Sequence, residues 1–284
     1  MSDQLENLLS LLDLEATGVD TFRGHGHGGS RPRMFGGHVA GQSLMAAGRT
    51  VTGMTAHSLH AYFLRPGDPN LPIDFHVDRP RDGRSFATRS VVASQNGEAI
   101  LQASMSFHVA ETGFEHQRSA PPAPPPAACM TWEAWAAPRL AQLSEARRNM
   151  LARDRPIEIR PIDPVDSANP APAGLEQRFW VRAGQGLPDD ALLHQCVATY
   201  TSDHTLLSCI LRPHSRTFMS NGVMAASLDH TIWFHRPFKM DQWLLYSQTT
   251  PVAHAARGLA LGHFFDEQGV LVASMAQEGL VRQR

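Results

Sequence analysis

Hydrophobic positions recur along the chain with two different periods, one typical of helices and one typical of strands. Near the N-terminus the helical spacing of Leu5, Leu8, Leu9 and Leu12 predicts a short amphipathic helix. Longer helices are predicted at residues 37–50 and 188–211, and the second of these opens with a proline and two aspartates, as helix starts often do. A strand-like run, FWVRAG at residues 179–184, precedes this second helix.

The strand-like part of the pattern occurs twice. Residues 58–67 read SLHAYFLRPG, and residues 227–238, about 170 positions later, read SLDHTIWFHRPF. Each copy leads into alternating runs with a hairpin signal, Asn96-Gly97 in the first and Gln268-Gly269 in the second, and then into a strand that contains Ala-Ser-Met. The spacing indicates a domain-sized duplication and not a short solenoid repeat. Each half is therefore predicted to form a strand, a long helix and four antiparallel strands.

This order of elements predicts the fold class. Strands that curve around one central helix describe the hotdog fold, so the two halves predict an α+β double hotdog. The predicted units are an N-terminal hotdog, a proline-rich linker with a surface helix, and a C-terminal hotdog that carries the catalytic residues, at residues 1–118, 119–175 and 176–284.

The linker has its own pattern. APPAPPPAA at residues 120–128 contains five prolines, which exclude a helix or a central strand there. Residues 132–154 are predicted to be helical after Pro138 and to pack on the outside of the molecule. A second proline-rich run follows at residues 161–172.

Composition narrows the class of protein. With 284 residues, of which 42% are hydrophobic, the chain can bury a large core. Its net charge of −2 lacks the clustered basic excess of a nucleic-acid-binding protein. The N-terminus does not read as a signal peptide, and no apolar run reaches the ~18 residues that a membrane helix needs. We therefore expect a cytoplasmic protein with neither a nucleic acid nor a membrane as partner.

Metal-binding patterns are weak. Cys129, Cys196 and Cys209 are widely spaced and match neither a zinc site nor a disulfide framework. GHGHGG at residues 24–29 places two histidines in a glycine loop without nearby cysteine or carboxylate ligands, which is more typical of a mobile loop beside an active site. No metal site is predicted.

Seven segments, in order, resemble the acyl-CoA thioesterase II family. They run from about residue 35 to residue 282 and read FGGHVAGQSL, HSLHAYFLRPGDP, RDGRSFATR, GFEHQ, SLDHTIWFHRPF, WLLYS and ARGLALGHFFDEQGVLVASMAQEG. The resemblance implies two fused hotdog units that hydrolyse fatty acyl-CoA to free fatty acid and coenzyme A. It implies no metal or redox cofactor, with coenzyme A present only as part of the substrate. It also implies a homo-oligomer, because double hotdogs of this family commonly associate through their sheets.

One carboxylate is unusual in the second long helix. Apolar residues recur there every three or four positions and predict a buried stripe made of Cys196, Tyr200, Leu207 and Ile210. Asp203 falls within this stripe, where a lone carboxylate is costly unless it is paired or used. The position aligned with it in the first half is Gly41, so the acid occurs in one half only. A structural and a catalytic role both fit, and the resemblance favours catalysis.

The resemblance implies two further catalytic residues in the second half. Ser227 begins the repeated strand motif, where the family commonly has threonine, and its first-half match is Ser58. Gln277 lies in the last strand and is matched by Phe107, but a buried glutamine, unlike a phenylalanine, needs hydrogen-bond partners. Asp203, with its pKa raised by burial, would act as the general base on a water molecule that Ser227 and Gln277 hold in place.

The first half is expected to polarise the substrate carbonyl. Gly36, Gly37 and His38 lie where the first long helix begins, and backbone N–H groups at a helix start stabilise developing negative charge. His57 lies beside the expected opening of the site and is a further substrate-binding candidate.

Other functions have less support. The chain has no Gly-x-Ser-x-Gly elbow, P-loop or HExxH motif. A hotdog hydratase or dehydratase of enoyl thioesters would need a paired Asp and His, but Asp203 and His204 would point about 100° apart on a continuous helix. A non-catalytic acyl-CoA-binding protein would be expected to lack the polar trio. Arg84 and Arg257 match across the repeat, and either could meet a coenzyme A phosphate.

Overall fold

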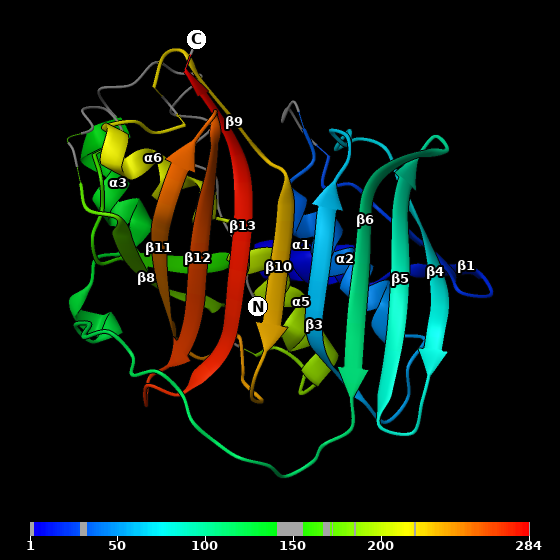
Figure 1. Cartoon of the computed structure of the whole chain (residues 1–284). Coiled ribbons are helices and arrows are strands. Elements are labelled where there is room, and N and C mark those ends of the chain that lie inside the picture. Colours follow the sequence, from blue (N-terminus) through cyan, green and yellow to red (C-terminus); the bar gives the residue numbers. More distant parts are fainter. Residues whose placement is uncertain are drawn as a thin grey trace.

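The strands form one antiparallel sheet with helices on one of its faces (Figure 1). The computed structural model describes residues 3–28, 33–140, 156–166, 171, 173–184, 186–218 and 220–283. The first half contains α1 (Asp3–Leu12), β1 (Glu15–Gly18), β2 (Thr21–Gly24), α2 (Gly36–Gly48), β3 (Thr55–Phe63), β4 (Ile73–Asp82), β5 (Phe86–Gln95) and β6 (Glu98–His108). The rest contains α3 (Trp132–Leu140), β7 (Ile157–Pro161), β8 (Glu176–Ala183), α5 (Ala191–Ser202), α6 (Leu206–Leu211), β9 (Val223–Ser227), β10 (Asp229–Phe234), β11 (Leu244–His254), β12 (Arg257–Asp266) and β13 (Leu271–Gln283), with short 3₁₀ turns at Pro126–Ala128 and Arg212–His214.

The sheet joins the two halves at its centre. Its strand order is β1-β2-β4-β5-β6-β3-β10-β13-β12-β11-β8-β7, and β9 also pairs with β13. The central pair is β3 with β10, where His60 lies opposite Thr231. Reading outward from this pair, each half has the same order of equivalent strands, so an approximate twofold axis relates the halves. This arrangement confirms the predicted α+β double hotdog.

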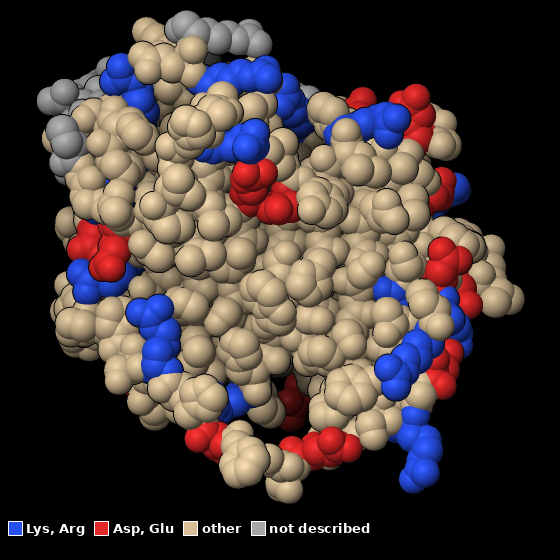
Figure 2. Space-filling model, viewed as in Figure 1, with Lys and Arg blue, Asp and Glu red and all other residues tan. Residues whose placement is uncertain are grey.

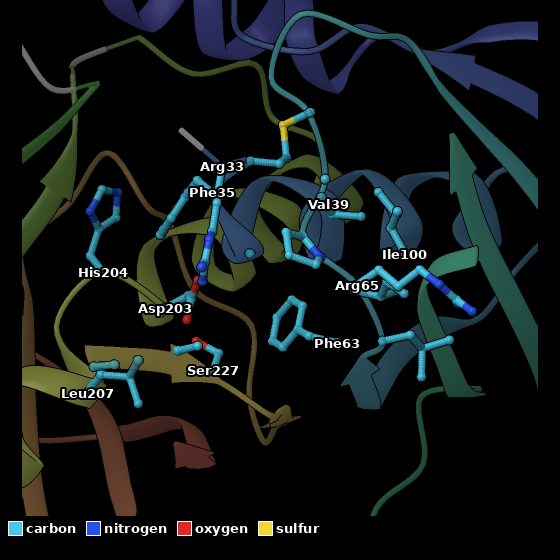
Figure 3. A pocket seen from close by; sticks show the side chains of 18 of the residues that line it. Arg33, Phe35, Val39, Phe63, Arg65, Ile100, Asp203, His204, Leu207 and Ser227 are labelled. Atoms are coloured by element: carbon cyan, nitrogen blue, oxygen red, sulfur yellow. The ribbon is translucent and has the colours of Figure 1, made fainter. Parts of the chain in front are cut away.

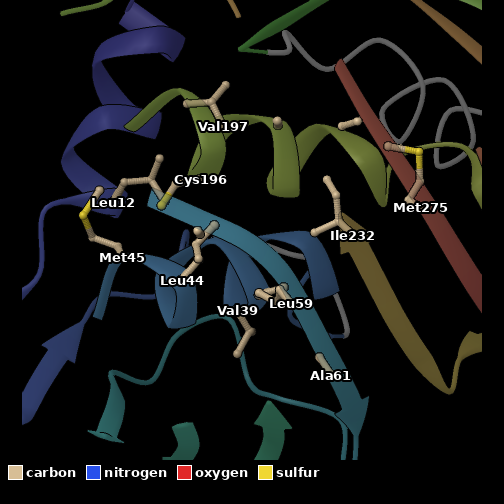
Figure 4. Close-up of a cluster of buried hydrophobic side chains, with 14 of the residues drawn as sticks. Leu12, Val39, Leu44, Met45, Leu59, Ala61, Cys196, Val197, Ile232 and Met275 are labelled. Carbon is tan, nitrogen blue, oxygen red and sulfur yellow. The ribbon is translucent and has the colours of Figure 1, made fainter. Parts of the chain in front are cut away.

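The helices α2 and α5 cross behind the sheet and run antiparallel (Figure 1). Gly37 lies against the carbonyl of Tyr200, and Gly41 lies against the carbonyl of Cys196. Apolar side chains of both helices pack on the central strands, among them Leu59 of β3 (Figure 4). The crossing brings the first turn of α2, from the first half, beside the last turn of α5, from the second half.

The second long helix is interrupted, which the sequence pattern did not indicate. It is split into α5 and α6, and Asp203 is the C-cap of α5. The break falls in Thr-Ser-Asp-His-Thr at residues 201–205, residue types that favour helix ends because side chains such as those of Thr201 and Ser202 hydrogen-bond to nearby carbonyls. Thr201 Oγ1, for example, donates to the carbonyl of Val197 at 2.7 Å. The expectation that Asp203 sits within a continuous helical stripe is therefore wrong.

The linker region is more ordered than its composition suggests. The helix α3 includes Pro138, so the expectation that helix begins only after that proline is wrong, and residues 141–154 lie outside the described part of the chain. The strand β7 was not expected, and it pairs with β8 at the edge of the sheet. The second proline-rich run begins where this strand ends, at Pro161.

The first proline-rich run packs on the outer face of the C-terminal half. Trp180 Nε1 donates to the carbonyl of Pro124 at 2.8 Å, and Arg160 donates to the carbonyl of Pro126 at 2.8 Å. Beneath the run lie the buried side chains of Trp180, Leu245 and Phe265. A proline-rich segment is suited to this position, because it is extended and leaves its carbonyls free to accept hydrogen bonds.

The rest of the outer face is poor in charge at its centre (Figure 2). Lys, Arg, Asp and Glu side chains lie mainly toward the margins of the view. Tyr62 of β3 and Trp233 of β10, on the two central strands, are exposed. In the described part of the chain, no helix is long and apolar enough to cross a membrane.

The sheet also shows which residues of the two halves are structurally equivalent. Arg65 Nη1 donates to the carbonyl of Ala99 at 2.9 Å, and Arg236 Nη1 donates to the carbonyl of Leu271 at 3.1 Å. These equivalent contacts show that equivalent residues of β3 and β10 are 171 positions apart, and those of β6 and β13 are 172 positions apart.

This register corrects two sequence matches. Ser227 pairs with Gly279 as Ala56 pairs with Phe107, so Ser227 corresponds to Ala56 and not to Ser58. By the same register, Gln277 corresponds to Met105, not Phe107. The two Ala-Ser-Met tripeptides are therefore out of register by two residues. Because side chains alternate between the two faces of a strand, a shift of two leaves the pattern of buried and exposed positions unchanged and is not visible in the sequence.

The match of Asp203 with Gly41 is also wrong. Asp203 ends α5, whereas Gly41 lies in the middle of α2 at the helix crossing. The absence of a side chain at Gly41 has its own reason, because a Cβ there would lie only 3.1 Å from the carbonyl oxygen of Cys196.

We predict that Gly41→Leu weakens the helix crossing. Overpacking of this kind typically lowers the free energy of unfolding by about 1–3 kcal/mol. Urea unfolding followed by circular dichroism measures the loss. Gly113→Leu is the matched control, because it adds the same atoms in an exposed segment where nothing lies within 4 Å of the new Cβ. Equal unfolding midpoints for the two variants would contradict the close packing at Gly41.

Candidate active site

A pocket of about 430 Å³ opens at the junction of the two halves. Its walls are mainly apolar and include Val39, Phe63, Ile100 and Leu207, while Arg33 and Arg65 also line it (Figure 3). Asp203 and Ser227 contribute polar groups to the same wall, and their side chains lie next to each other. The pocket thus combines an apolar chamber, two cations and one carboxylate.

The carboxylate of Asp203 is held from both halves of the chain. Its Oδ2 accepts a 2.7 Å hydrogen bond from the backbone N–H of Gly37, in the first turn of α2. Its Oδ1 accepts a 2.6 Å hydrogen bond from Nε2 of Gln277, in β13. Two donors on opposite sides fix the orientation of the carboxylate, so Asp203 presents one geometry to the pocket.

Gln277 links the acid to the hydroxyl group. The same Nε2 that donates to Asp203 also donates to Oγ of Ser227 at 2.8 Å, so both amide hydrogens are used. Gln277 is fully buried, and among the described residues its Oε1 has no hydrogen-bond partner. Because Ser227 Oγ accepts from Gln277, its own hydrogen can be donated to the carboxylate of Asp203. The three predicted catalytic residues are thus brought together, and all three come from the second half.

Burial raises the pKa of Asp203 to about 6. Desolvation of the charged carboxylate is the main cause, and the hydrogen bonds from Gln277, Gly37 and Ser227 oppose it in part. A carboxyl group with this pKa is ionised at neutral pH and is also a stronger base than an exposed aspartate.

Asp203 also caps a helix that has no cap of its own. The N-cap residue of α2 is Phe35, whose side chain makes no capping hydrogen bond. The carboxylate of Asp203 supplies the missing acceptor and lies at the positive end of the helix dipole. A side chain at Gly36 would prevent this approach, because its Cβ would lie 2.8 Å from both Asp203 Oδ2 and the ring of Phe63.

The three residues expected to polarise the carbonyl lie in different surroundings. Gly36 lines the pocket. The amide of Gly37 donates to Asp203, and the amide of His38 lies 3.1 Å from the carbonyl of Phe35, which accepts from it. The His38 side chain is buried, with Nε2 3.1 Å from the carbonyl of His25, and it does not line the pocket.

His57 is not part of the pocket either. It lies on the side of β3 away from the helices, where its ring contacts Phe86 and His108 with centroid distances of 5.9 and 6.3 Å. Burial lowers its pKa, but it has no contact with the catalytic group. The sequence motif placed it near the site along the chain, while the β-bulge between Ala56 and Ser58 turns it to the other face.

His204 was not among the predicted site residues, but it lines the pocket beside Asp203. Its ring packs against Phe35 and Tyr200 at centroid distances of 4.7 and 5.1 Å. Both side chains line the chamber, and the premise that they lie on one continuous helix is wrong, because α5 ends before Asp203, its C-cap. The helix-breaking sequence around Asp203 was the signal that could have revealed this.

The cations near the pocket differ from those matched across the repeat. Arg84 lies in the connection between β4 and β5, and Arg257 pairs with Glu278 at 3.0 Å, and neither lines the pocket. Arg33 and Arg65 do, and Arg65 is the arginine of the first Arg-Pro pair. In the described residues, no group of three or more His, Cys, Asp or Glu side chains is arranged to hold a metal ion.

Comparisons with known proteins agree with this geometry. The family model described as acyl-CoA thioesterase N-terminal domain matches residues 26–108, and the model described as acyl-CoA thioesterase matches residues 154–280. The chain is 39% identical to acyl-coenzyme A thioesterase 8 of Homo sapiens, over 96% of this chain and 88% of that protein. It is 38% identical to acyl-CoA thioesterase 2 of Haemophilus influenzae, over 99% of both.

A solved structure shares both sequence and fold. The acyl-CoA thioesterase II TesB2 from Mycobacterium marinum is 40% identical, with a TM-score of 0.79 over 99% of this chain and 97% of that one. These similarities extend over both halves and include the described part of the linker. The chain therefore belongs to the acyl-CoA thioesterase family.

Proposed function

We propose that this acyl-CoA thioesterase hydrolyses its substrate with a water molecule that Asp203, Ser227 and Gln277 hold and activate. The observation that carries the proposal is the shared hydrogen bonding of one half-buried carboxylate, with Gln277 Nε2 donating both to Asp203 and to Ser227. Asp203 and Ser227 face the apolar pocket, so a water between them would lie beside a bound thioester.

One proton moves in the proposed reaction, from the water to Asp203 and then to the leaving thiolate. The water donates one hydrogen to the carboxylate of Asp203 and the other to Oγ of Ser227, whose own hydrogen is donated to the same carboxylate. As the water oxygen bonds to the thioester carbon, Asp203 takes the proton. Collapse of the tetrahedral intermediate breaks the C–S bond, and coenzyme A leaves as a thiolate that then takes this proton. A thiol with a pKa near ~8.5 needs little help to leave, so a single base suffices.

The first half contributes to the other side of the carbonyl group. We place the carbonyl oxygen at the first turn of α2, against Gly36, where the helix dipole favours negative charge. The amide of Gly37 remains with Asp203 and maintains the alignment of the base. The reaction would thus use a base from one half and a helix terminus from the other.

The pocket lining suggests how the substrate is oriented. Phe63, Ile100 and Leu207 fit an apolar acyl chain, and the guanidinium groups of Arg33 and Arg65 fit the phosphates of coenzyme A. This chemistry requires no metal or redox cofactor, and coenzyme A enters only as part of the substrate.

Two further expectations stay predictions. The cytoplasmic location rests on the sequence pattern alone. The homo-oligomer rests on the resemblance and gains support from the low charge at the centre of the outer sheet face (Figure 2).

We predict that kcat/KM rises with pH and levels off, with one inflection near pH 6. Only the ionised form of Asp203 can accept a proton, and its pKa is about 6. Thiol release from acyl-CoA esters, measured from about pH 4.5 to about pH 9, tests this. Thermal unfolding at each pH verifies that the protein stays folded. An inflection near the ordinary aspartate value, or a flat profile, would argue against Asp203 as the base.

We predict that Asp203→Asn lowers kcat by about 10²–10⁴-fold for every acyl chain length. The measurement is thiol release from a short-to-long series of acyl-CoA esters. Asp189→Asn is the control, because Asp189 is exposed and pairs with Lys239 away from the pocket. Turnover that survives in Asp203→Asn would remove this residue from the mechanism, and no release by the wild type would refute hydrolysis itself.

The free energy of unfolding of the wild type should fall more between about pH 4 and about pH 8 than that of the same variant. Because the folded pKa of Asp203 lies above the unfolded value of 3.8, the folded state holds a proton more tightly. The stability from this group is full below about pH 4 and is lost as pH rises through about 6. Between about pH 4 and about pH 8 the wild type should therefore lose roughly 1–3 kcal/mol more than the variant, and an equal pH dependence of the two proteins would contradict the desolvated carboxylate.

We predict that Arg33→Gln raises KM for acyl-CoA roughly tenfold, because a charged hydrogen bond to phosphate is lost. KM for the matching acyl-N-acetylcysteamine thioester, which carries no phosphate, should not change. Arg84→Gln is the control, since Arg84 does not line the pocket. An equal rise in KM for both thioesters would show that Arg33 does not recognise the phosphates.

A further inference from the structure

A histidine occupies a core position in the catalytic half where the other half has leucine. His230 of β10 is fully buried and pairs with Ala61 across the centre of the sheet. The register of the repeat makes Leu59, also fully buried, its counterpart in β3, and Figure 4 shows Leu59 among the apolar side chains beneath the helices. Replacing a core leucine with histidine costs desolvation, so the imidazole needs a compensating role.

The imidazole has one close polar contact. Its Nε2 lies 2.7 Å from Oγ of Ser202, and that oxygen lies 2.9 Å from the carbonyl of Thr199. Since a carbonyl can only accept, the Ser202 hydroxyl donates to Thr199, and Nε2–H of His230 donates to Ser202 Oγ. Nδ1 is then a bare acceptor, and it has no hydrogen-bond partner among the described residues. Burial lowers the pKa of His230 to about 4, so the ring is neutral near pH 7.

Ser202 is the last residue of α5 and directly precedes Asp203. Its backbone carbonyl accepts a 2.6 Å hydrogen bond from the hydroxyl of Tyr246, a buried residue of β11. The sheet therefore holds both the side chain and the carbonyl of Ser202 at the point where the helix ends. The direction in which the chain leaves α5, and so the position of Asp203, depends on these two contacts.

We propose that His230 is a positioning residue that acts through Ser202 to align the carboxylate of Asp203 for catalysis. This inference rests on the proposed role of Asp203 as the base. His230 touches neither the pocket nor Asp203 in any of the described contacts, so its effect is on geometry. Small displacements of a catalytic group can lower the rate by about 10²-fold without loss of substrate binding.

The decisive variant is His230→Leu, which gives the catalytic half the residue of its counterpart. We expect it to fold with an unchanged or higher unfolding temperature, because an imidazole with an unpartnered nitrogen is removed. Its kcat should fall about 10–100-fold, while KM for acyl-CoA stays within about twofold. His230→Gln, whose Nε2 can donate to Ser202, should recover much of kcat. A purely structural role for His230 would not predict this recovery.

Two controls separate positioning from general loss of stability. Ile232→Val removes one methyl group from the same strand, so it should lower the unfolding temperature and leave kcat unchanged. Ser202→Ala should lower kcat like His230→Leu, and the double variant should be no slower than either single one, since both act through one hydrogen bond.

The outcomes distinguish this inference from the proposed mechanism. Full kcat in His230→Leu, or no recovery in His230→Gln, with an inactive Asp203→Asn would overturn only the role of His230. Turnover that survives in Asp203→Asn would overturn both, because His230 would then have no base to align. A loss of kcat in His230→Leu with a rise in KM of the same size would assign His230 to substrate binding and also refute positioning.

Discussion

The hydrogen bond between the amide of Gly37 and the carboxylate of Asp203 is the contact on which the rest of the site depends. It joins the first turn of one central helix to the last turn of the other. It can form only because α2 and α5 cross antiparallel, with Gly41 allowing the close approach. It also requires α5 to end at Asp203, which the Thr-Ser-Asp-His-Thr sequence favours. The fusion of two hotdog units therefore creates the site at their junction, not inside either unit.

The desolvation cost of the polar residues at the site falls mainly on the second half. The first half retains Ala56, Leu59 and Met105 where the second has Ser227, His230 and Gln277. Each polar replacement in a core costs desolvation unless hydrogen bonds compensate it, and here most of the bonds run among the replacements and Asp203. The first half contributes part of the chamber wall, including Val39, Phe63 and Ile100, and supplies a helix terminus. An approximately symmetric fold thus holds a strongly asymmetric site.

Much of this could be predicted from the sequence, because hairpin and helix signals are local. Asn96-Gly97 and Gln268-Gly269 marked the hairpins, and the α2 and β8 segments were recognisable by their periodicity. The register of the repeat could not be predicted, because a shift of two residues leaves each side chain on the same face of the strand. The end of α5 could not be predicted for a different reason. Each residue there has an ordinary helix propensity by itself, and only the cluster as a whole disfavours the helix. The placement of His57 depended on a bulge, which has no reliable sequence signal.

The groups that hydrogen-bond to Asp203 are all neutral, and together with burial they set its pKa. Desolvation raises its pKa, and the donors Gln277, Gly37 and Ser227 lower it, which together leave it near 6. A cation close to the carboxylate would shift this balance toward the ordinary aspartate value and weaken the base. The imidazole of His230 hydrogen-bonds to Ser202, and burial in the apolar core lowers its pKa and keeps it neutral. The core therefore sets the strength of the base in two ways, by desolvating the carboxylate and by keeping the group that supports it uncharged.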